Sequence, residues 1–382
     1  MASTSIHTLP SDEKDDFPIY GPLIPALGGP MRLPAIVYGA GAFSNQYNSD
    51  DHITSELPLR TVRLALRYGI KAFDTSVYYG PSEIVLGNML QALRDEFPRS
   101  SYQLMTKCGR YGVSKFDYSP ENIRRSVMQS LDRLQTNYVD TVYLHDVEFV
   151  ATPIQPKTSG NHASALNADA AAYGLADGDE AKIRGEGDQK VLDAFHELQR
   201  MQEEGLVKNI GITGLPLPTL LRLAILIAHT PPFRSVDVLL SYSHLCLQNS
   251  TLLEFIPYFQ KRAKVKEVVA ASPLSMGLLT PSPPPWHPAP PNLRQATADA
   301  IQSWGQDFPQ LAVGYSMRKA SAYENPLPLA IGLSSPTEVH EAVKAWRKIT
   351  DSTTTSDDQK GEELVQKIFE KAGYLDWSWA SP

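Results

Sequence analysis

Three ionisable residues stand at the ends of short apolar runs of the kind that form buried strands. They are Asp74 after GIKAF, Lys107 after YQLMT, and His145 after YVDTVYL. The carboxyl ends of parallel strands in a closed barrel share one rim, and catalytic groups of barrel enzymes lie on that rim. Exposure at a strand end explains any one of these charges equally well. Three neighbouring strands that end in complementary groups favour an active site.

Tyr79, five residues beyond Asp74, is the candidate proton donor and acceptor. A free phenol titrates near pH ~10, so a tyrosine that exchanges a proton near neutral pH needs a cation beside it. Lys107 could supply the cation, Asp74 would keep a buried Lys107 charged, and His145 would orient a substrate oxygen. Tyr78 competes for this role, although alternation along an extended segment would send it to the opposite side.

Eight runs rich in Val, Ile, Leu and Tyr alternate with longer amphipathic stretches, which indicates βαβ units and a parallel sheet. The runs lie at 34–39, 69–73, 102–106, 138–144, 208–213, 237–242, 267–272 and 327–332. Eight strands with crossover helices over this length favour a single (β/α)8 barrel, the TIM barrel, over an open sheet.

Apolar residues at helical spacing predict helices over 58–69, 119–135 and 190–205. The first and third end at glycines, which commonly follow the last turn of a helix. The second begins with Ser119 as the expected side-chain cap and Pro120 at the first helical position.

Two segments interrupt the alternation of expected strands and helices, and an N-terminal segment precedes it. We expect residues 1–33 to form an N-terminal extension and 34–382 the barrel, with 151–188 as a long flexible insertion after the fourth strand. The proline-dense stretch 280–292 follows the seventh strand, where active-site loops of barrels lie. Trp286 in this stretch either lines a substrate site or braces the loop.

Composition excludes several classes of protein. The chain has 382 residues, of which 42% are hydrophobic, and a formal net charge of -7, which argues against nucleic-acid binding. No apolar run is long enough for a membrane span, and no secretory signal is visible. Two cysteines, Cys108 and Cys246, indicate no disulfide framework and no metal site, so a cytoplasmic protein is expected.

The segment DTSVYYGPSEIVLG at 74–87 resembles the signature of the aldo-keto reductase family. The signature residues that match are Asp74, Tyr79, Gly80, Ser82, Glu83, Leu86 and Gly87, with Lys107 in MTKCG and His145 in YLHD at the other catalytic positions. The resemblance covers about 34–349 apart from the insertion. It implies a barrel enzyme that uses a nicotinamide cofactor, with Tyr79, Asp74, Lys107 and His145 as its catalytic residues.

The resemblance also places the cofactor across the barrel rim. A dinucleotide fingerprint is missing after the first strand, where Gly39-Ala40-Gly41 has no third glycine, so a Rossmann domain is not supported. The cofactor contacts that the resemblance implies are Gly41, Thr213, Ser272, Leu274, Gly277, Gly332, Ser335, Glu338 and Glu341.

Ser335 and Glu338 open the helix expected after the last strand. Ser335 is either an ordinary helix cap or part of a phosphate site, and the two are about equally supported. NADP-using relatives place an Arg on this turn, whereas Glu338 falls at or next to that position. A carboxylate would repel a 2′-phosphate and accept hydrogen bonds from a ribose diol, so NAD is preferred over NADP.

Three segments, GITGLPL, LHDVEF and SYSHL, are similar to the sugar 1-dehydrogenase branch of the family, which includes plant L-galactose dehydrogenase and fungal D-arabinose 1-dehydrogenase. The chain departs from many reductases at Thr213-Gly214, where those have Ser-Asn, and at Ala271, where they have an aromatic residue. The resemblance implies oxidation of an aldose at C1 to an aldonolactone, with a small-molecule sugar as substrate.

Two alternatives stay open at this point. One is an NADPH-dependent aldehyde or ketone reductase that uses the same four residues in reverse. The other is a cofactor-binding regulatory subunit, similar to the potassium-channel beta subunits of the family. We expect no nucleic-acid or membrane partner and a monomer or weak homo-oligomer, and specificity is expected in loops.

Overall fold

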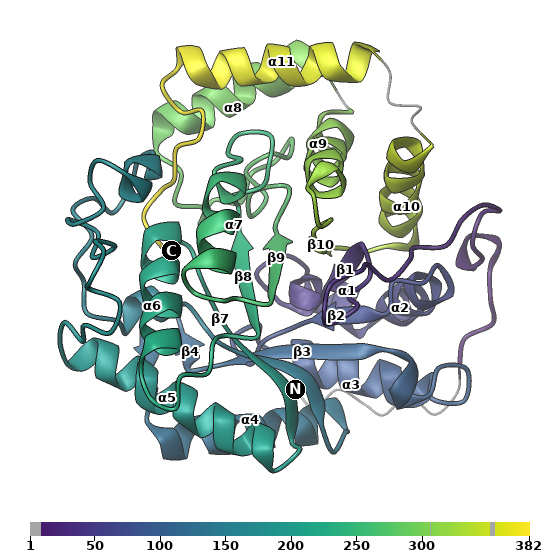
Figure 1. The fold of residues 1–382 in the computed structure, drawn as a ribbon. Coiled ribbons are helices and arrows are strands. Elements are labelled where there is room, and N and C mark those ends of the chain that lie inside the picture. Colours follow the sequence, from purple (N-terminus) through teal and green to yellow (C-terminus); the bar gives the residue numbers. More distant parts are fainter. Residues whose placement is uncertain (1–8, 306, 352–355) are drawn as a thin grey trace. The chain divides into compact units, whose positions relative to one another are not determined.

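Eight parallel strands close into a barrel in this computed structural model, which describes residues 9–305, 307–351 and 356–382 (Figure 1). Their order around the barrel is β1-β10-β9-β8-β7-β6-β3-β2. The strands are β1 (Ile36–Gly39), β2 (Ala72–Asp74), β3 (Gln103–Cys108), β6 (Val139–Leu144), β7 (Val207–Gly214), β8 (Val238–Tyr242), β9 (Glu267–Ala271) and β10 (Leu329–Gly332). Each expected apolar run overlaps one of these strands, so the (β/α)8 fold predicted from the sequence is confirmed.

The helices follow the strands in chain order, and a two-stranded hairpin of β4 (Arg110–Gly112) and β5 (Lys115–Phe116) follows β3. The helices are α1 (Asp50–Thr54), α2 (Leu57–Arg67), α3 (Ser82–Ala92), α4 (Pro120–Leu134), α5 (Glu186–Glu203), α6 (Leu217–His229), α7 (Leu252–Lys261), α8 (Pro291–Trp304), α9 (Phe308–Ala322), α10 (Pro336–Thr350) and α11 (Ser356–Lys371). In the part of the chain that the structure describes, no helix is both long and apolar enough to cross a membrane.

The chain divides into two compact units, each made of several segments. The first comprises 1–145, 190–211 and 330–343, and the second comprises 146–189, 212–329 and 344–382. The first unit contains β1, β2, β3 and β6, which are consecutive in the barrel. The register pairs Gly39 with Asp74 and Lys107 with Tyr143, so the carboxyl ends of β1, β2, β3 and β6 lie side by side.

Helix α4 forms as its sequence predicts, with one exception at its start. Ile123, Val127 and Leu131 are buried on one face, and Pro120 occupies the first turn. Ser119 stands at the N-cap position, but its side chain makes no capping bond. Its hydroxyl donates to Asp117 Oδ1 at 2.6 Å.

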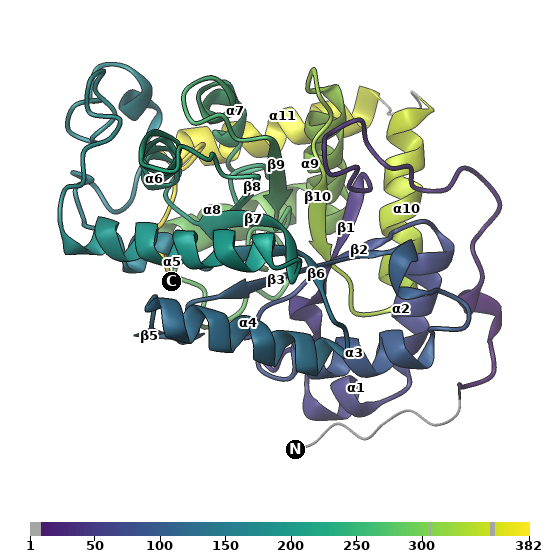
Figure 2. The ribbon, with the colours of Figure 1, turned by 60° about the horizontal axis from the view of Figure 1, so that its bottom comes forward.

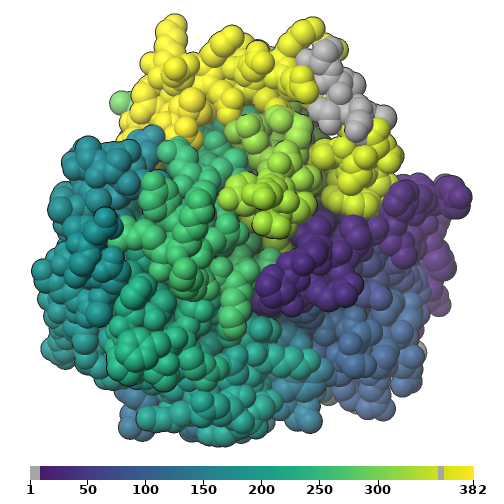
Figure 3. Space-filling view, in the orientation of Figure 1, coloured from purple at the N-terminus to yellow at the C-terminus, as the bar shows by residue number. Residues whose placement is uncertain are grey.

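The N-terminal extension packs against α2 in the first unit. Figures 1 and 2 show this purple segment running beside α2, and Figure 3 shows it on the surface next to the blue part of the chain. Arg60 on α2 pairs with Asp16, and Arg67 pairs with Asp12. Gly69, just after α2, has φ +90°, and a Cβ there would lie 2.7 Å from the Ile24 carbonyl oxygen, so only glycine fits.

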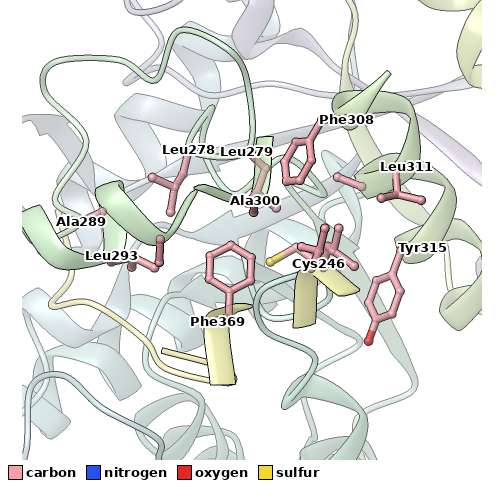
Figure 4. Packing of buried hydrophobic residues seen from close by; sticks show 14 of the residues in the cluster. Cys246, Leu278, Leu279, Ala289, Leu293, Ala300, Phe308, Leu311, Tyr315 and Phe369 are labelled. Atoms are coloured by element: carbon pink, nitrogen blue, oxygen red, sulfur yellow. The ribbon is translucent and has the colours of Figure 1, made fainter. Parts of the chain in front are cut away.

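The second unit has a core of its own beneath its C-terminal helix. Helices α8 and α11 lie side by side in both ribbon views (Figures 1 and 2). Phe308, Tyr315 and Phe369 pack there around Cys246 and Leu279, as Figure 4 shows. Burying aromatic and aliphatic side chains of this size contributes about 1.5–3 kcal/mol each.

The insertion at 151–188 belongs to the second unit and has little regular structure apart from a 3-10 helix at Ala163–Leu166. Helix α5 already begins at Glu186. Asp188, fully buried, receives two hydrogen bonds from Arg222 at 2.7 and 2.9 Å and one from Thr152 N at 3.1 Å. These bonds attach both ends of the insertion to α6.

Candidate active site

Asp74, Lys107 and His145 lie on three adjacent strand ends in the first unit. Asp74 ends β2, Lys107 is the penultimate residue of β3, and His145 directly follows β6. The ladder continues past β6, where His145 N donates to the Cys108 carbonyl oxygen at 2.9 Å. All three side chains are buried, with exposed fractions of 6%, 2% and 4%. The spatial grouping that we expected for these residues is therefore present.

Lys107 makes two hydrogen bonds through its ammonium group. It donates to Asp74 Oδ1 and to the Thr75 carbonyl oxygen, the latter at 2.9 Å. Burial opposes the charged form, but Asp74 and Tyr79 outweigh it and raise the pKa of Lys107 above its usual value. A permanent positive charge therefore lies beside the Tyr79 ring, with Lys107 Nζ 4.7 Å from the ring centroid.

His145 is kept neutral by its surroundings. Burial, together with the nearby charges of Lys107 and Arg110, holds the pKa of His145 well below its ordinary range. The edge of this ring meets Tyr79, with centroids 5.8 Å apart. A neutral imidazole carries one proton, so its role depends on which nitrogen holds it.

The contact with Ser76 indicates which nitrogen of His145 carries the proton. The Ser76 hydroxyl oxygen accepts from Tyr78 N at 3.1 Å and lies 3.0 Å from His145 Nδ1. Ser76 is fully buried, so its hydroxyl hydrogen needs an acceptor, and Nδ1 is the one within reach. Nδ1 therefore accepts, and the proton of the neutral ring sits on Nε2.

The other residues of the 74–87 motif hold this arrangement together. Ser82 Oγ donates to the Ala40 carbonyl oxygen at 2.7 Å and lies 2.8 Å from Thr75 Oγ1. Glu83, also buried, accepts from Thr106 Oγ1 at 2.6 Å. A Cβ on Gly87 would lie 2.1 Å from the Arg133 carbonyl oxygen, so glycine lets α3 and α4 approach closely. These residues hold the turn that carries Tyr79 from outside it.

Tyr78 and Tyr79 face the same histidine. The Tyr78 ring also meets His145 edge-on at 5.8 Å, with an interplanar angle of 75°. Residues 77–81 lie in a turn, and Tyr79 N donates to the Ser76 carbonyl oxygen, so strand alternation does not apply. The opposite placement of Tyr78 was expected only for an extended segment, and that condition is not met.

The expected cofactor residues fall in both units, and each group is described by itself. Gly41, Gly332, Ser335, Glu338 and Glu341 belong to the first unit. A Cβ on Gly41 would lie 3.8 Å from the Tyr79 ring, so this glycine is next to the ring. Gly332 is exposed at the end of β10, next to β1 in the barrel.

Ser335 and Glu338 act together at the start of α10. Ser335 Oγ accepts from Glu338 N at 3.3 Å, and the Glu338 carboxylate accepts from Ser334 N at 2.6 Å. This is the geometry of a reciprocal helix cap, so the capping role considered for Ser335 is present. Glu338 remains exposed, and its carboxylate adds a negative charge to this turn.

In the second unit, the loop after β9 satisfies its own backbone. Ser272, Ser275 and Met276 all have positive φ, and the N–H groups of Ser275, Met276 and Gly277 are donated within the loop. A Cβ on Gly277 would lie 2.9 Å from Pro284 Cδ, and φ there is +86°, so both space and conformation require glycine. Leu274 belongs to the same turn and packs on the apolar core of that unit.

Thr213 is the clearest sign of a missing polar ligand in the second unit. It lies near the end of β7, is buried, and its hydroxyl has no hydrogen-bond partner among residues 9–305, 307–351 and 356–382. A buried hydroxyl without a partner costs about 1–3 kcal/mol. This hydroxyl could therefore hold a polar group of a dinucleotide.

Trp286 lies in the proline-rich loop between β9 and α8, and its side chain is 40% exposed. It stacks on His287 with centroids 6.3 Å apart. His287 is buried and bonds to the Ser275 carbonyl oxygen at 2.9 Å. The loop is therefore anchored through His287, which leaves the indole at the surface.

Sequence reasoning missed Ser76, Arg110 and Gln46 as parts of this site, and Glu148 just after it. Ser76 is two residues from Asp74 and Arg110 is three from Lys107, so proximity to the matched motif was the available signal. Gln46 lies in the loop after β1 and carried no signal. Within the described part of the chain, no three His, Cys, Asp or Glu side chains gather in a way that could hold a metal.

Comparison with known proteins agrees with this geometry. Residues 35–361 match the model of the aldo/keto reductase family. L-galactose dehydrogenase from Arabidopsis thaliana is 36% identical over 91% of this chain and 94% of its own. D-arabinose 1-dehydrogenase from Saccharomyces cerevisiae is 34% identical over 90% of this chain and 92% of its own.

Solved structures show the same fold at low identity. An aldo-keto reductase from Bacillus halodurans covers 90% of this chain and 96% of its own, with a TM-score of 0.59 and 18% identity. The glycerol dehydrogenase from Gluconobacter oxydans covers 95% of this chain and 97% of its own, with a TM-score of 0.56 and 18% identity. The chain therefore belongs to the aldo/keto reductase family, whose members are nicotinamide-dependent oxidoreductases.

Proposed function

We propose that this enzyme oxidises an aldose at C1 to the aldonolactone, using NAD and with Tyr79 as the acid/base. The observation that carries the proposal is the buried contact of Lys107 with both Asp74 and Tyr79, next to a neutral His145. The names of the two relatives that match over nine-tenths of the chain support a sugar as the substrate, of the D-arabinose or L-galactose type.

Tyr79 performs the proton transfer in this proposal. The C1 hydroxyl proton passes to the Tyr79 oxygen, and the electron pair of that O–H bond becomes the second C–O bond of the lactone. The Lys107 ammonium stabilises the phenolate that must accept this proton. Asp74 keeps Lys107 protonated throughout, because a lone buried ammonium would lose its proton.

His145 orients the oxygen that reacts. With its proton on Nε2, the imidazole donates a hydrogen bond to the C1 oxygen and holds C1 in place. A nicotinamide cofactor, when bound, would supply the hydride acceptor for C1. In the first unit, Gly41, Gly332 and the α10 turn are the residues that would contact a dinucleotide. In the second unit, the candidates are Thr213 and the loop after β9, which contains Ser272, Leu274 and Gly277.

Glu338 supports NAD over NADP. Its carboxylate lies on the first turn of α10 and is bonded to Ser334 N, so the negative charge is held at that turn. A 2′-phosphate placed there would meet like charge, whereas a ribose diol would meet an acceptor. Glu341, one turn further on, adds a second exposed carboxylate to the same helix.

The test is a set of initial rates at 340 nm with D-arabinose, L-galactose and other aldoses, with NAD and NADP in parallel. We expect turnover with NAD that falls by about 10³-fold or more in Tyr79→Phe, since the acid/base is removed. Reduction of simple aldehydes by NADPH, without oxidation of any sugar, would overturn both the dehydrogenase assignment and the role given to Glu338.

A further inference from the structure

Tyr78 is a second phenol at the catalytic histidine. Its ring centroid lies 5.8 Å from His145, the same distance as for Tyr79, and the two phenol rings are 6.2 Å apart. The Tyr78 side chain is only partly buried, so a ligand can reach it. The proton transfer described above uses Tyr79 and assigns nothing to Tyr78.

The Tyr78 hydroxyl oxygen accepts two hydrogen bonds and gives none. Gln46 Nε2 and Arg110 Nη2 both donate to it at 3.3 Å. Neither the amide nitrogen nor the guanidinium can accept a hydrogen bond in return. Among residues 9–305, 307–351 and 356–382, no group accepts the hydrogen of this hydroxyl. The O–H is thus oriented by its neighbours and available to an acceptor from outside the protein.

Arg110 makes this hydroxyl a better donor. The guanidinium carbon lies 4.2 Å from the Tyr78 ring centroid, and the Arg110 side chain is only 4% exposed. It is held in the β4–β5 hairpin by contacts to the carbonyl oxygens of Gly112 and Val113, both at 3.4 Å. A cation that donates to a hydroxyl oxygen strengthens the hydrogen bond which that hydroxyl gives, since successive hydrogen bonds polarise one another.

We propose that Tyr78 donates a hydrogen bond to a second oxygen of the substrate, on a carbon close to the reacting one, and so selects for polyhydroxylated substrates. This inference rests on the proposed function. A site built to hydrogen-bond a hydroxyl rejects an analogue that lacks it, because the protein group is then left without its partner. Tyr79 acts on the C1 oxygen, and Tyr78 recognises the neighbouring one.

The experiment compares wild type and Tyr78→Phe on the aldose that is turned over best and on its 2-deoxy and 3-deoxy analogues. We expect kcat/KM of the variant to fall by about 10- to 100-fold for the parent sugar, mainly through KM. For the analogue that lacks the contacted hydroxyl, the same substitution should change kcat/KM by less than about 3-fold. Equal losses on all three sugars would overturn the proposal.

Tyr102→Phe is the matched control. It removes a phenol hydroxyl at the start of β3, in the same unit but away from His145, and should leave kcat/KM unchanged for every sugar. If wild type oxidises no aldose, the proposed function fails, and the inference is tested separately with glyceraldehyde and propionaldehyde as substrates for reduction. Tyr78→Phe should then lower the preference for glyceraldehyde by about 10-fold; an unchanged preference would refute it.

Discussion

Asp74 in the first unit is a buried carboxyl group, and Glu148 in the second is a partly buried one with the opposite kind of neighbour. Asp74 ends β2 and pairs with the Lys107 ammonium. Glu148 lies in the 3-10 turn Val147–Phe149 after β6, accepts from Leu215 N at 3.0 Å and from Ser381 Oγ at 2.7 Å, and faces the charge of Asp146.

The neighbours decide how far the pKa of each carboxyl group rises. Burial raises the pKa of Asp74 above its ordinary value, and Lys107 limits this rise. Burial also raises the pKa of Glu148, and the like charge of Asp146 adds to it, so that it reaches about 7 despite the two hydrogen bonds. A neighbouring cation limits the rise in the pKa of one acid, whereas a neighbouring acid increases the rise in the pKa of the other.

Removing the cation should turn Asp74 into an unpaired buried charge, which is the largest effect expected. In Lys107→Met, kcat should fall by about 10³-fold or more, because Tyr79 loses the charge that stabilises its phenolate. The free energy of unfolding should fall by about 3–5 kcal/mol, because the Asp74 carboxylate stays buried alone. Steady-state rates and urea unfolding at pH 7 measure both.

The double variant Lys107→Met with Asp74→Asn separates the loss of kcat from the loss of stability. It removes the uncompensated charge, so most of the lost stability should return while kcat stays low. If stability were not recovered, repulsion of an isolated carboxylate would not be the cause. If kcat were recovered, Tyr79 would need no cation.

His145 is a base whose pKa is lowered by its surroundings, whereas the two carboxyl groups have raised pKa values. Ser76→Ala removes the donor to Nδ1, so the proton is no longer confined to Nε2, and kcat should fall by about 10- to 100-fold. Nitrogen-15 NMR of labelled histidine should show a tautomer change. Ser76→Thr keeps the hydroxyl and should restore both kcat and the wild-type tautomer. Ser82→Ala deletes another buried hydroxyl that does not touch His145, and an equal tautomer change there would contradict this account.

Glu148→Gln should change how stability depends on pH. The folded pKa of about 7 lies above the ordinary value of a glutamate, so the native state binds a proton more tightly than the unfolded state between these values. Stability contributed by this group therefore falls as pH rises from about 4.5 to 7. The variant lacks that loss. The difference in melting temperature, variant minus wild type, should therefore be more positive at pH 8 than at pH 5, by about 2 °C or more. A difference independent of pH would contradict the raised pKa.

Glu338, an exposed carboxylate, should give the smallest effect. Glu338→Gln keeps an oxygen that can cap Ser334 N and removes only the charge. The preference for NAD over NADP, as a ratio of kcat/KM values, should fall by about 3- to 10-fold, because exposed charges are screened by water and salt. Glu363→Gln on α11 is a matched control in the second unit and should leave the ratio unchanged.

Much of the fold could be predicted, because strands and helices have short-range signals. Buried β-branched runs and the glycine after α2 are readable from neighbouring residues alone. The grouping of Asp74, Lys107 and His145 followed from one further rule, since parallel strands present their carboxyl ends on the same rim. Ser119 occupies the expected N-cap position, but its side chain makes no capping bond and donates to Asp117, two residues away.

The sequence by itself determined the eight strands, the ionisable residues at the ends of three of them, and Tyr79 as the phenol expected next to Lys107. Only the tertiary structure decided which partner each buried group has. Ser76 and His145 are 69 residues apart, and Tyr78 and Arg110 are 32 apart. A buried hydrogen bond or charge depends on the few ångströms around it, and no local pattern of residues records which distant side chain fills that space.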